Sequence, residues 1–301
     1  MKFMNRTHEA WRKVEPEGPM HKGNGSDPDA APVLADTDPI IFALTADDAA
    51  TQSDGNVETS LAQCRLADWH PDRKTMLCFD SNGSTPGVEN FRALRSRLYQ
   101  VRERSPFKTL AIVSSVPKEG RSFVAANLAQ AMARQHGSRV LLLDADLRNS
   151  SLHSALGTYQ TPGLSECLLG EAGEMSIIQR GPIENLFFLA GGRPVSGQSD
   201  VISNGRLKPL LDRLSALFDW IVIDSPAALP VTDAELIASF CDGVLMVVRS
   251  NSTPFDLVRK ARNRFREEHI LGVVLNGIPV EKHPENHYNH GFSDKPNGKW
   301  E

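Results

Sequence analysis

The stretch that decides the fold is an apolar run followed by a glycine-containing loop and a helical pattern. Residues 110–122 read Leu-Ala-Ile-Val-Ser-Ser-Val-Pro-Lys-Glu-Gly-Arg-Ser. A strand, a loop of this length and a helix amino end form a phosphate-binding loop, whose backbone N–H groups surround phosphate oxygens. Gly120 and Ser122 match the common pattern G-x-x-x-x-G-K-[ST]. Ser115 replaces its first glycine and Arg121 its lysine, so the loop predicts nucleotide binding and leaves phosphate transfer open.

Two further apolar segments end in carboxylates. Residues 140–144 read Val-Leu-Leu-Leu-Asp and lead to Asp146, and residues 220–224 read Trp-Ile-Val-Ile-Asp. Because ligands bind outside the carboxyl ends of the strands of an open parallel sheet, Asp144, Asp146 and Asp224 are expected beside the loop. Carboxylates next to phosphates suit Mg²⁺, which keeps several waters and takes few protein ligands. Each acid taken alone could equally be a solvated strand end or a helix cap.

From residue 110 onward, strand and helix patterns alternate, which predicts an α/β doubly wound, mostly parallel sheet. Runs rich in Val, Ile and Leu indicate strands buried on both faces, joined by right-handed crossovers. The expected strands are 110–114, 140–144, 186–190, 220–224, 243–248 and 273–276. The expected helices are 88–102, 122–135, 207–217, 232–239 and 254–269.

Composition limits the classes of function. The net charge of −4 gives no basic field for nucleic acid. The four cysteines show no C-x-x-C spacing, as expected in a reducing compartment. No signal peptide is recognised, and no run approaches the ~18 apolar residues that span a bilayer. We therefore expect a cytoplasmic protein without a transmembrane segment of its own.

Three regions are expected along the chain. Residues 1–86 form a largely disordered N-terminal extension, because 23–60 contain eight acidic residues and no Lys or Arg. Within it, residues 6–15 could form a docking helix or merely a frayed one. Residues 87–279 form the nucleotide-binding domain, and 280–301 a flexible polar tail.

The chain resembles the bacterial tyrosine kinases of capsule and exopolysaccharide synthesis. Residues 115–122, 140–148 and 220–226 resemble their Walker A, Walker A′ and Walker B motifs, and the resemblance extends over 89–278. It implies a P-loop NTPase fold of the type shared with the cell-division and plasmid-partition ATPases (MinD and ParA). It also implies ATP and Mg²⁺ as cofactors.

The resemblance assigns roles to individual residues. Asp144 would activate the attacking hydroxyl, and Arg121 stands where the phosphate-binding lysine would be. Asp224 would hold the metal through water, and Asn276 would contact adenine. The implied nucleotide-binding residues are Lys118, Glu119, Gly120, Arg121, Ser122, Phe123 and Asn276. The implied metal ligands are Ser122, Asp144, Asp146 and Asp224.

The basic helix expected over 88–102 carries a motif of its own. Glu89, Arg92 and Arg95 match the E-x-x-R-x-x-R oligomerisation pattern of the family. These side chains project from neighbouring turns and could pair with a second copy, which predicts a homo-oligomer. A solvated basic face is the alternative.

Two features depart from the family pattern, one in the loop and one in the tail. Lys118 replaces a usual glycine, and Arg121 brings a wide planar fork to a loop built around a compact ammonium. Residues 279–301 hold one tyrosine, Tyr288, instead of a tyrosine cluster, which makes Tyr288 the candidate phosphoacceptor.

Three functional hypotheses follow. The leading one is an ATP-binding tyrosine-kinase-like protein that regulates a membrane polysaccharide co-polymerase and is recruited by it to the inner face of the membrane. The second is a pseudokinase, a nucleotide-binding switch without phosphoryl transfer. The third, a partition-type ATPase, would need a basic or amphipathic element at the C-terminus, which the tail from Pro279 lacks.

Overall fold

The computed structural model describes residues 57–79, 85–135 and 137–278. The chain divides into two compact units, and every element below belongs to the one that continues from Ser60. The expected docking helix at 6–15 and the tail with Tyr288 lie outside the described residues, as does most of the expected disordered extension.

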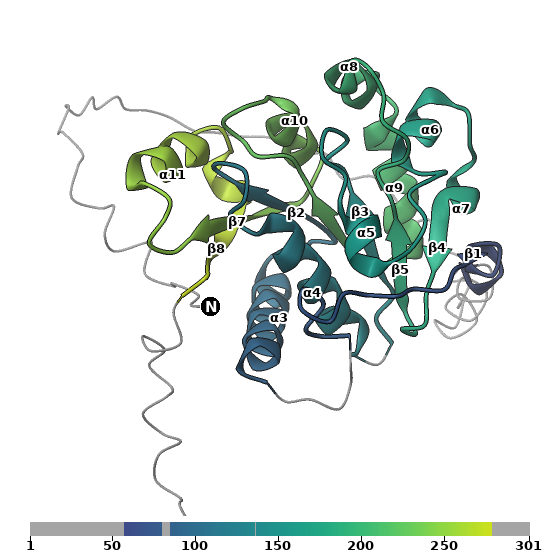
Figure 1. Cartoon of the computed structure of the whole chain (residues 1–301), viewed down its shortest axis with the longest axis horizontal. Helices are drawn as coiled ribbons and strands as arrows, with labels where there is room; N and C mark the ends of the chain where they lie inside the picture. Colours follow the sequence, from purple (N-terminus) through teal and green to yellow (C-terminus); the bar gives the residue numbers. More distant parts are fainter. Residues whose placement is uncertain (1–56, 80–84, 136, 279–301) are drawn as a thin grey trace, which may run out of the picture. The chain divides into compact units, whose positions relative to one another are not determined.

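An eight-stranded sheet, in the order β1-β4-β5-β3-β6-β2-β7-β8, forms the centre of this unit (Figure 1). Neighbouring strands run parallel except β4 and β5, which are antiparallel. The strands are β1 (Arg65–Leu66), β2 (Thr109–Ser114), β3 (Val140–Asp144), β4 (Ile178–Arg180), β5 (Leu186–Leu189), β6 (Trp220–Asp224), β7 (Gly243–Arg249) and β8 (Ile270–Asn276). The predicted doubly wound, mostly parallel α/β fold is confirmed.

The helices connect these strands. They are α3 (Pro86–Arg104), α4 (Arg121–Ala133), α5 (Leu152–Leu156), α6 (Leu164–Leu169), α7 (Glu174–Ile177), α8 (Gln198–Ser203), α9 (Leu207–Leu217), α10 (Asp233–Ser239), α11 (Phe255–Arg262) and a 3₁₀ turn, Glu267–His269. Helix α3 starts before the expected residue 88 because Pro86 occupies its first turn and Thr85 accepts the Val88 N–H as its N-cap. The helix expected over 254–269 is shorter: α11 ends with Asn263 as its C-cap, and a 3₁₀ turn follows.

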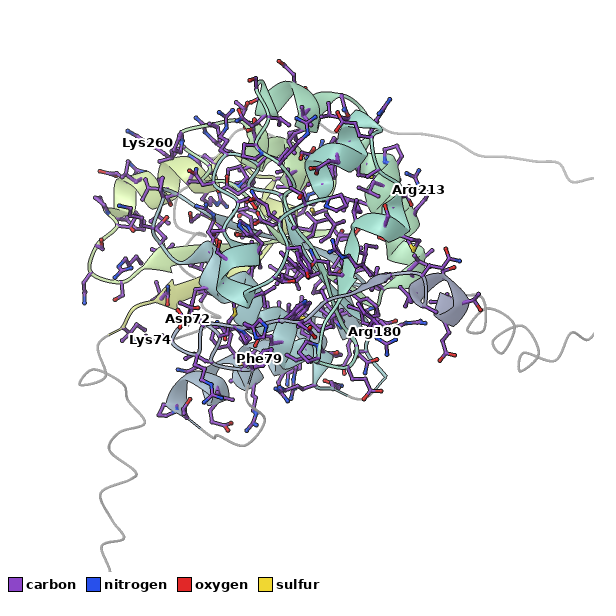
Figure 2. All side chains as sticks on the ribbon, turned by 45° about the vertical axis from the view of Figure 1, so that its right-hand side comes forward. Asp72, Lys74, Phe79, Arg180, Arg213 and Lys260 are labelled. Atoms are coloured by element: carbon purple, nitrogen blue, oxygen red, sulfur yellow. The ribbon has the colours of Figure 1, made fainter. Side chains whose placement is uncertain are left out.

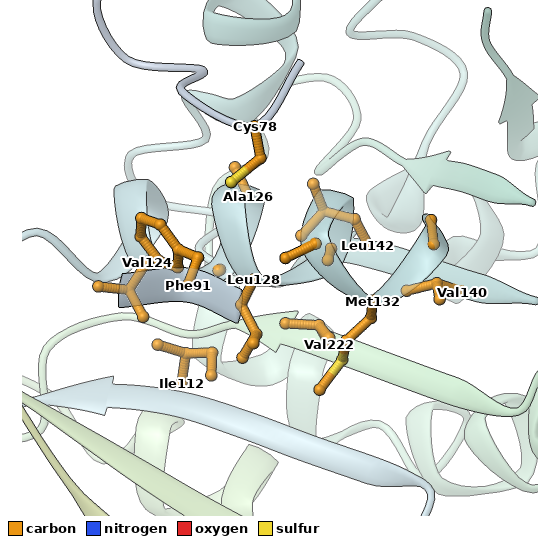
Figure 3. Packing of buried hydrophobic residues seen from close by; sticks show 14 of the residues in the cluster. Cys78, Phe91, Ile112, Val124, Ala126, Leu128, Met132, Val140, Leu142 and Val222 are labelled. Atoms are coloured by element: carbon orange, nitrogen blue, oxygen red, sulfur yellow. The ribbon is translucent and has the colours of Figure 1, made fainter. Parts of the chain in front are cut away.

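Alternate residues of each strand face different helix layers. Helix α4, covered by α3, packs on one face, where Ile112 and Val222 of the sheet meet Leu128 and Met132 (Figure 3). On the other face α9 packs on β6 and α10 on β2. Helix α4 is buried on all sides, which its small and apolar residues permit. This position fixes its amino end at the carboxyl edge of the sheet.

Residues 67–79, which we call the strap, cross α4 within the same unit (Figure 1), and Figure 2 labels Asp72, Lys74 and Phe79 along this segment. Trp69, Met76 and Cys78 are buried in the core. Asn127 of α4 donates to Thr75 O at 2.7 Å and accepts the Cys78 N–H at 3.2 Å. The compact unit therefore begins ahead of the boundary expected at residue 87. Its few, widely spaced apolar residues gave the strap no strand or helix periodicity.

Candidate nucleotide-binding site

Three adjacent strands bring the predicted acids to one edge of the sheet. In the register, Asp144 at the end of β3 is the partner of Asp224 at the end of β6, and Asp224 is also the partner of Ile112 in β2. Strand β2 leads through the loop 115–120 into α4. The loop and the acids are therefore held at the same edge, as the sequence predicted from the parallel-strand rule.

The loop needs unusual backbone conformations. Lys118 has φ 68° and Gly120 has φ 96°, both in the left-handed region. A Cβ at Gly120 would lie 2.0 Å from Nδ2 of Asn276 and force this amide to move, and the positive φ itself favours glycine. Asn276, at the end of β8, donates to Glu119 O at 2.9 Å. Asn276 therefore lies against the loop, while Lys118 extends from it as an exposed cation.

Glu119 holds the loop to the neighbouring strand. Its buried carboxylate accepts the Val116 N–H at 2.8 Å, the Thr253 hydroxyl at 2.5 Å and the Arg249 N–H at 3.2 Å. This side chain is thus engaged by protein donors. The sequence did not predict Thr253 and Arg249 as donors to Glu119, because they lie 134 and 130 positions away from it along the chain.

Arg121 turns inward below the loop. Its Nε donates to Ser225 O at 2.7 Å, Nη1 to Ser114 Oγ at 2.7 Å and Nη2 to Asp146 Oδ2 at 3.1 Å. Nε also lies 3.9 Å from Oδ1 of Asp224. The side chain is only 10% exposed. The guanidinium therefore joins the carboxyl ends of β2 and β6 with the segment after β3, and it is the cation of the acidic cluster.

Asp144 is buried and fixed by the chain that follows it. Its Oδ2 accepts the Ser150 hydroxyl at 2.8 Å and the N–H groups of Ser151 and Leu152. Burial raises the pKa of Asp144 to about 6, although these hydrogen bonds act against the rise. Such a carboxylate is largely ionised at neutral pH and more basic than an exposed one.

Asp224 is the least satisfied acid of the cluster. Its Oδ1 is buried and has no hydrogen-bond partner. Burial raises the pKa of Asp224 to about 8 and Asp144 adds to the rise, while Arg121 and the Ser122 hydroxyl lower it. A free carboxylate oxygen beside a loop hydroxyl suits a magnesium ion held mainly by water and phosphate oxygens.

The acids do not form a metal cage by themselves. Within 57–79, 85–135 and 137–278, no group of three or more His, Cys, Asp or Glu side chains is placed to hold a metal ion. A site of this kind would thus be completed by phosphate oxygens and water. Ser122 and Asp224 are the residues that fit it, because Asp146 is paired with Arg121.

Other predicted residues lie away from the loop. The ring of Phe123 packs against Phe91 of α3 at 5.7 Å, so its side chain belongs to the core. The exposed side chains of Glu89 and Arg92 on α3 pair with each other, and Arg95 donates to Ala131 O of α4 at 2.7 Å. Arg95 is therefore engaged within its own chain.

A family model describes the same region. Residues 110–290 match the CobQ/CobB/MinD/ParA nucleotide binding domain. This match includes β2 from its second residue, the loop that follows it, all three acids and Asn276. It supports a nucleotide as the ligand of the edge described above.

Curated relatives carry the same kinase name. The tyrosine-protein kinase YwqD of Bacillus subtilis is 31% identical over 66% of this chain and 85% of its own length. A putative tyrosine-protein kinase, EpsB of Ralstonia nicotianae, is 32% identical over 70% of this chain. The chain spans 27% of the length of EpsB.

Solved structures share the fold. The chimerical protein CapA2B2 is 31% identical, with a TM-score of 0.64 over 75% of this chain and 99% of its own. The kinase domain of Escherichia coli tyrosine kinase ETK is 26% identical, with a TM-score of 0.63 over 73% of this chain and 83% of its own.

In the described part of the chain, every helix is too short or too polar to span a bilayer.

Proposed function

Because this chain belongs to the bacterial tyrosine-kinase family of CobQ/CobB/MinD/ParA-type nucleotide-binding domains, we propose that it binds ATP with Mg²⁺ and regulates exopolysaccharide or capsule synthesis through tyrosine phosphorylation. One observation carries the proposal. The loop 115–122 and the buried base candidate Asp144 lie at one edge of the sheet, on strands that flank β6. Phosphate donor and proton acceptor are thus held by one rigid scaffold.

The residues of this edge divide the work. ATP would supply the phosphoryl group, and the magnesium ion would neutralise charge on its oxygens. Ser122 and Asp224 would hold the ion. Asp144, whose pKa is raised to about 6 by burial, would accept the proton of the attacking tyrosine hydroxyl. Asn276 would contact the adenine.

A nucleotide-binding switch without phosphoryl transfer is the second candidate. Arg121 favours it, since three of its donors are already bonded to Ser225, Ser114 and Asp146. A cation held in this way does not follow the phosphoryl group during transfer. Loss of one well-placed stabilising group costs about 100- to 1,000-fold in rate. Binding could therefore persist where transfer is slow.

Radiolabelled ATP separates the two candidates. A kinase gives Mg²⁺-dependent label on tyrosine that is lost in Asp144→Asn, and we expect Arg121→Lys to raise labelling by about 100-fold or more. Tyr288→Phe tests whether Tyr288 is the acceptor. ATP binding without tyrosine label in either the wild type or Arg121→Lys identifies the switch. Absence of ATP binding contradicts both.

The proposed partner is a membrane polysaccharide co-polymerase, which would recruit this chain to the inner face of the membrane. The greater length of EpsB and the name of the CapA2B2 chimera support a kinase unit that works with a second component. We further propose a homo-oligomer formed through the exposed pair Glu89 and Arg92 of α3. Light scattering of Arg92→Ala tests it: an unchanged molar mass contradicts this interface.

A further inference from the structure

Arg121 occupies the centre of the acidic edge described above. Its three hydrogen bonds point in different directions, to Ser225 O, Ser114 Oγ and Asp146 Oδ2. The planar guanidinium matches such a set of separate acceptors, which the ammonium of a lysine cannot span from one point. Arg121 is therefore built into the scaffold of the site.

The acids that Arg121 neutralises are those that would attract a divalent ion. Nη2 is bonded to Asp146, and Nε lies 3.9 Å from Oδ1 of Asp224, which has no hydrogen-bond partner. A cation bound there meets the guanidinium at short range, in surroundings where charges are poorly screened. The remaining acid, Asp144, has its oxygens engaged by Ser150, the backbone N–H of Asp146 and the backbone N–H groups that follow Ser150.

We propose that Arg121 is a fixed internal cation that takes over part of the charge neutralisation of a divalent ion. This site then binds a nucleoside triphosphate nearly as well without Mg²⁺ as with it. The inference rests on the proposed nucleotide binding and deepens it. The exposed Lys118, on the same loop, adds a positive charge that is free of this scaffold.

Calorimetry with ATP and the full chain tests the inference, first with Mg²⁺ and then with EDTA. The wild-type dissociation constant should change by less than about threefold, whereas Arg121→Lys should lose about tenfold or more without Mg²⁺. Arg139→Lys is the matched control. Nε of Arg139 lies 3.6 Å from Oδ2 of Asp219, which precedes β6 at the opposite edge of the sheet. This variant should keep the wild-type ratio of the dissociation constants with and without Mg²⁺.

Each outcome decides a different statement. A wild-type loss of about tenfold or more in EDTA overturns the inference and leaves nucleotide binding intact. Absence of ATP binding in both buffers overturns the proposed function as well.

A second test titrates Mn²⁺ alone into the nucleotide-free wild type, follows binding by electron paramagnetic resonance and does not depend on Arg121→Lys. We expect binding weaker than about 1 mM. A tighter Mn²⁺ site that contains Asp224, shown by its loss in Asp224→Asn, would overturn the inference even if Arg121→Lys fails to fold.

Discussion

Acidic side chains lie at both ends of the parallel sheet, in opposite surroundings. At the amino edge, Asp242 accepts the N–H groups of Lys108 and Thr109 at 2.8 and 2.9 Å and the Thr109 hydroxyl at 2.8 Å. Burial favours its protonated form, but these bonds outweigh burial and hold the pKa of Asp242 below its usual value. At the carboxyl edge, Asp224 has an unpartnered oxygen and a pKa raised to about 8 by burial and by Asp144.

The difference separates an acid that is satisfied within the fold from one that has an oxygen available to a ligand. Asp242 is satisfied by donors of its own fold and stabilises the fold as an anion. Asp224 is held among other acids around one guanidinium, so its charge costs stability until a cation or ligand joins it. Perturbed acids of this second kind gather at binding sites.

The strongest way to break the carboxyl edge is Gly120→Ala. The new Cβ would lie 2.0 Å from Asn276 Nδ2, and the backbone has φ 96°. We expect ATP affinity to fall by about 100-fold or more, equivalent to ~2.7 kcal/mol, in a calorimetric titration. Gly205→Ala is the control, because Gly205 has φ 83° but nothing within 4 Å of its Cβ position. Equal losses of ATP affinity in the two variants would mean that general destabilisation by a strained backbone, not a change in the phosphate loop, is responsible.

Asp224→Asn should stabilise the protein as it disables the site. The folded pKa of about 8 exceeds the ordinary 3.8, so the folded state binds the extra proton and wild-type stability falls as the pH rises through this interval. The variant lacks this slope and should be more stable by about 2 kcal/mol at pH 9, with little gain at pH 4. Urea unfolding at both pH values measures the difference. Lower stability of the variant at pH 9 would show that the charge of Asp224 does not destabilise the folded state.

Asp242→Asn should act in the opposite direction. The pKa of Asp242 is lower in the folded state than in the unfolded state. Its stabilisation is therefore fully present at pH values above the unfolded-state pKa, and it is lost as the pH falls through the folded-state pKa. At pH 7 we expect the free energy of unfolding of the variant to be about 1–2 kcal/mol lower than that of the wild type, and we expect this difference to shrink in strong acid. Denaturant titrations across pH check it, with Asp256→Asn on the exposed surface of α11 as the control. ATP affinity should stay within about twofold, and a larger change would contradict a purely structural role.

Arg95→Ala should give the smallest effect. Arg95 bonds Ala131 O in the last turn of α4, away from the loop. Loss of this bond should lower the free energy of unfolding by about 1 kcal/mol and leave ATP affinity unchanged. Arg97→Ala removes an exposed arginine of the same helix that bonds Gln100, and it should cost less. A change in molar mass for Arg95→Ala would instead point to the role in self-association that the sequence motif predicts.

Much of the fold could be predicted because the central strands are buried on both faces. The predicted ranges of β3 and β6 agree with the structure, since each is a continuous apolar run. The short strands β1 and β4 were missed, because two and three residues carry no recognisable pattern. The strap was missed for a similar reason: its core side chains are held by a helix far along the sequence.

The site was predictable in composition but not in orientation. Parallel strands bring Asp144, Asp146 and Asp224 together by topology alone, and no side-chain detail is needed for that. The inward turn of Arg121 depends on Ser225, which is 104 positions away. The engagement of Glu119 likewise depends on distant donors. Local sequence encodes neither contact.

The bonds between the strap and α4 affect how the domain can be shortened. Arg134 donates to the carbonyl oxygens of Cys78 and Phe79, and Gln130 donates to the sulfur of Met76. A recombinant fragment trimmed to residue 87 would remove these acceptors, and the buried amides of Asn127 and Gln130 would keep only their bonds to Phe123 O and Ala126 O within α4. Stable expression of the nucleotide-binding domain should therefore require a starting point upstream of Trp69.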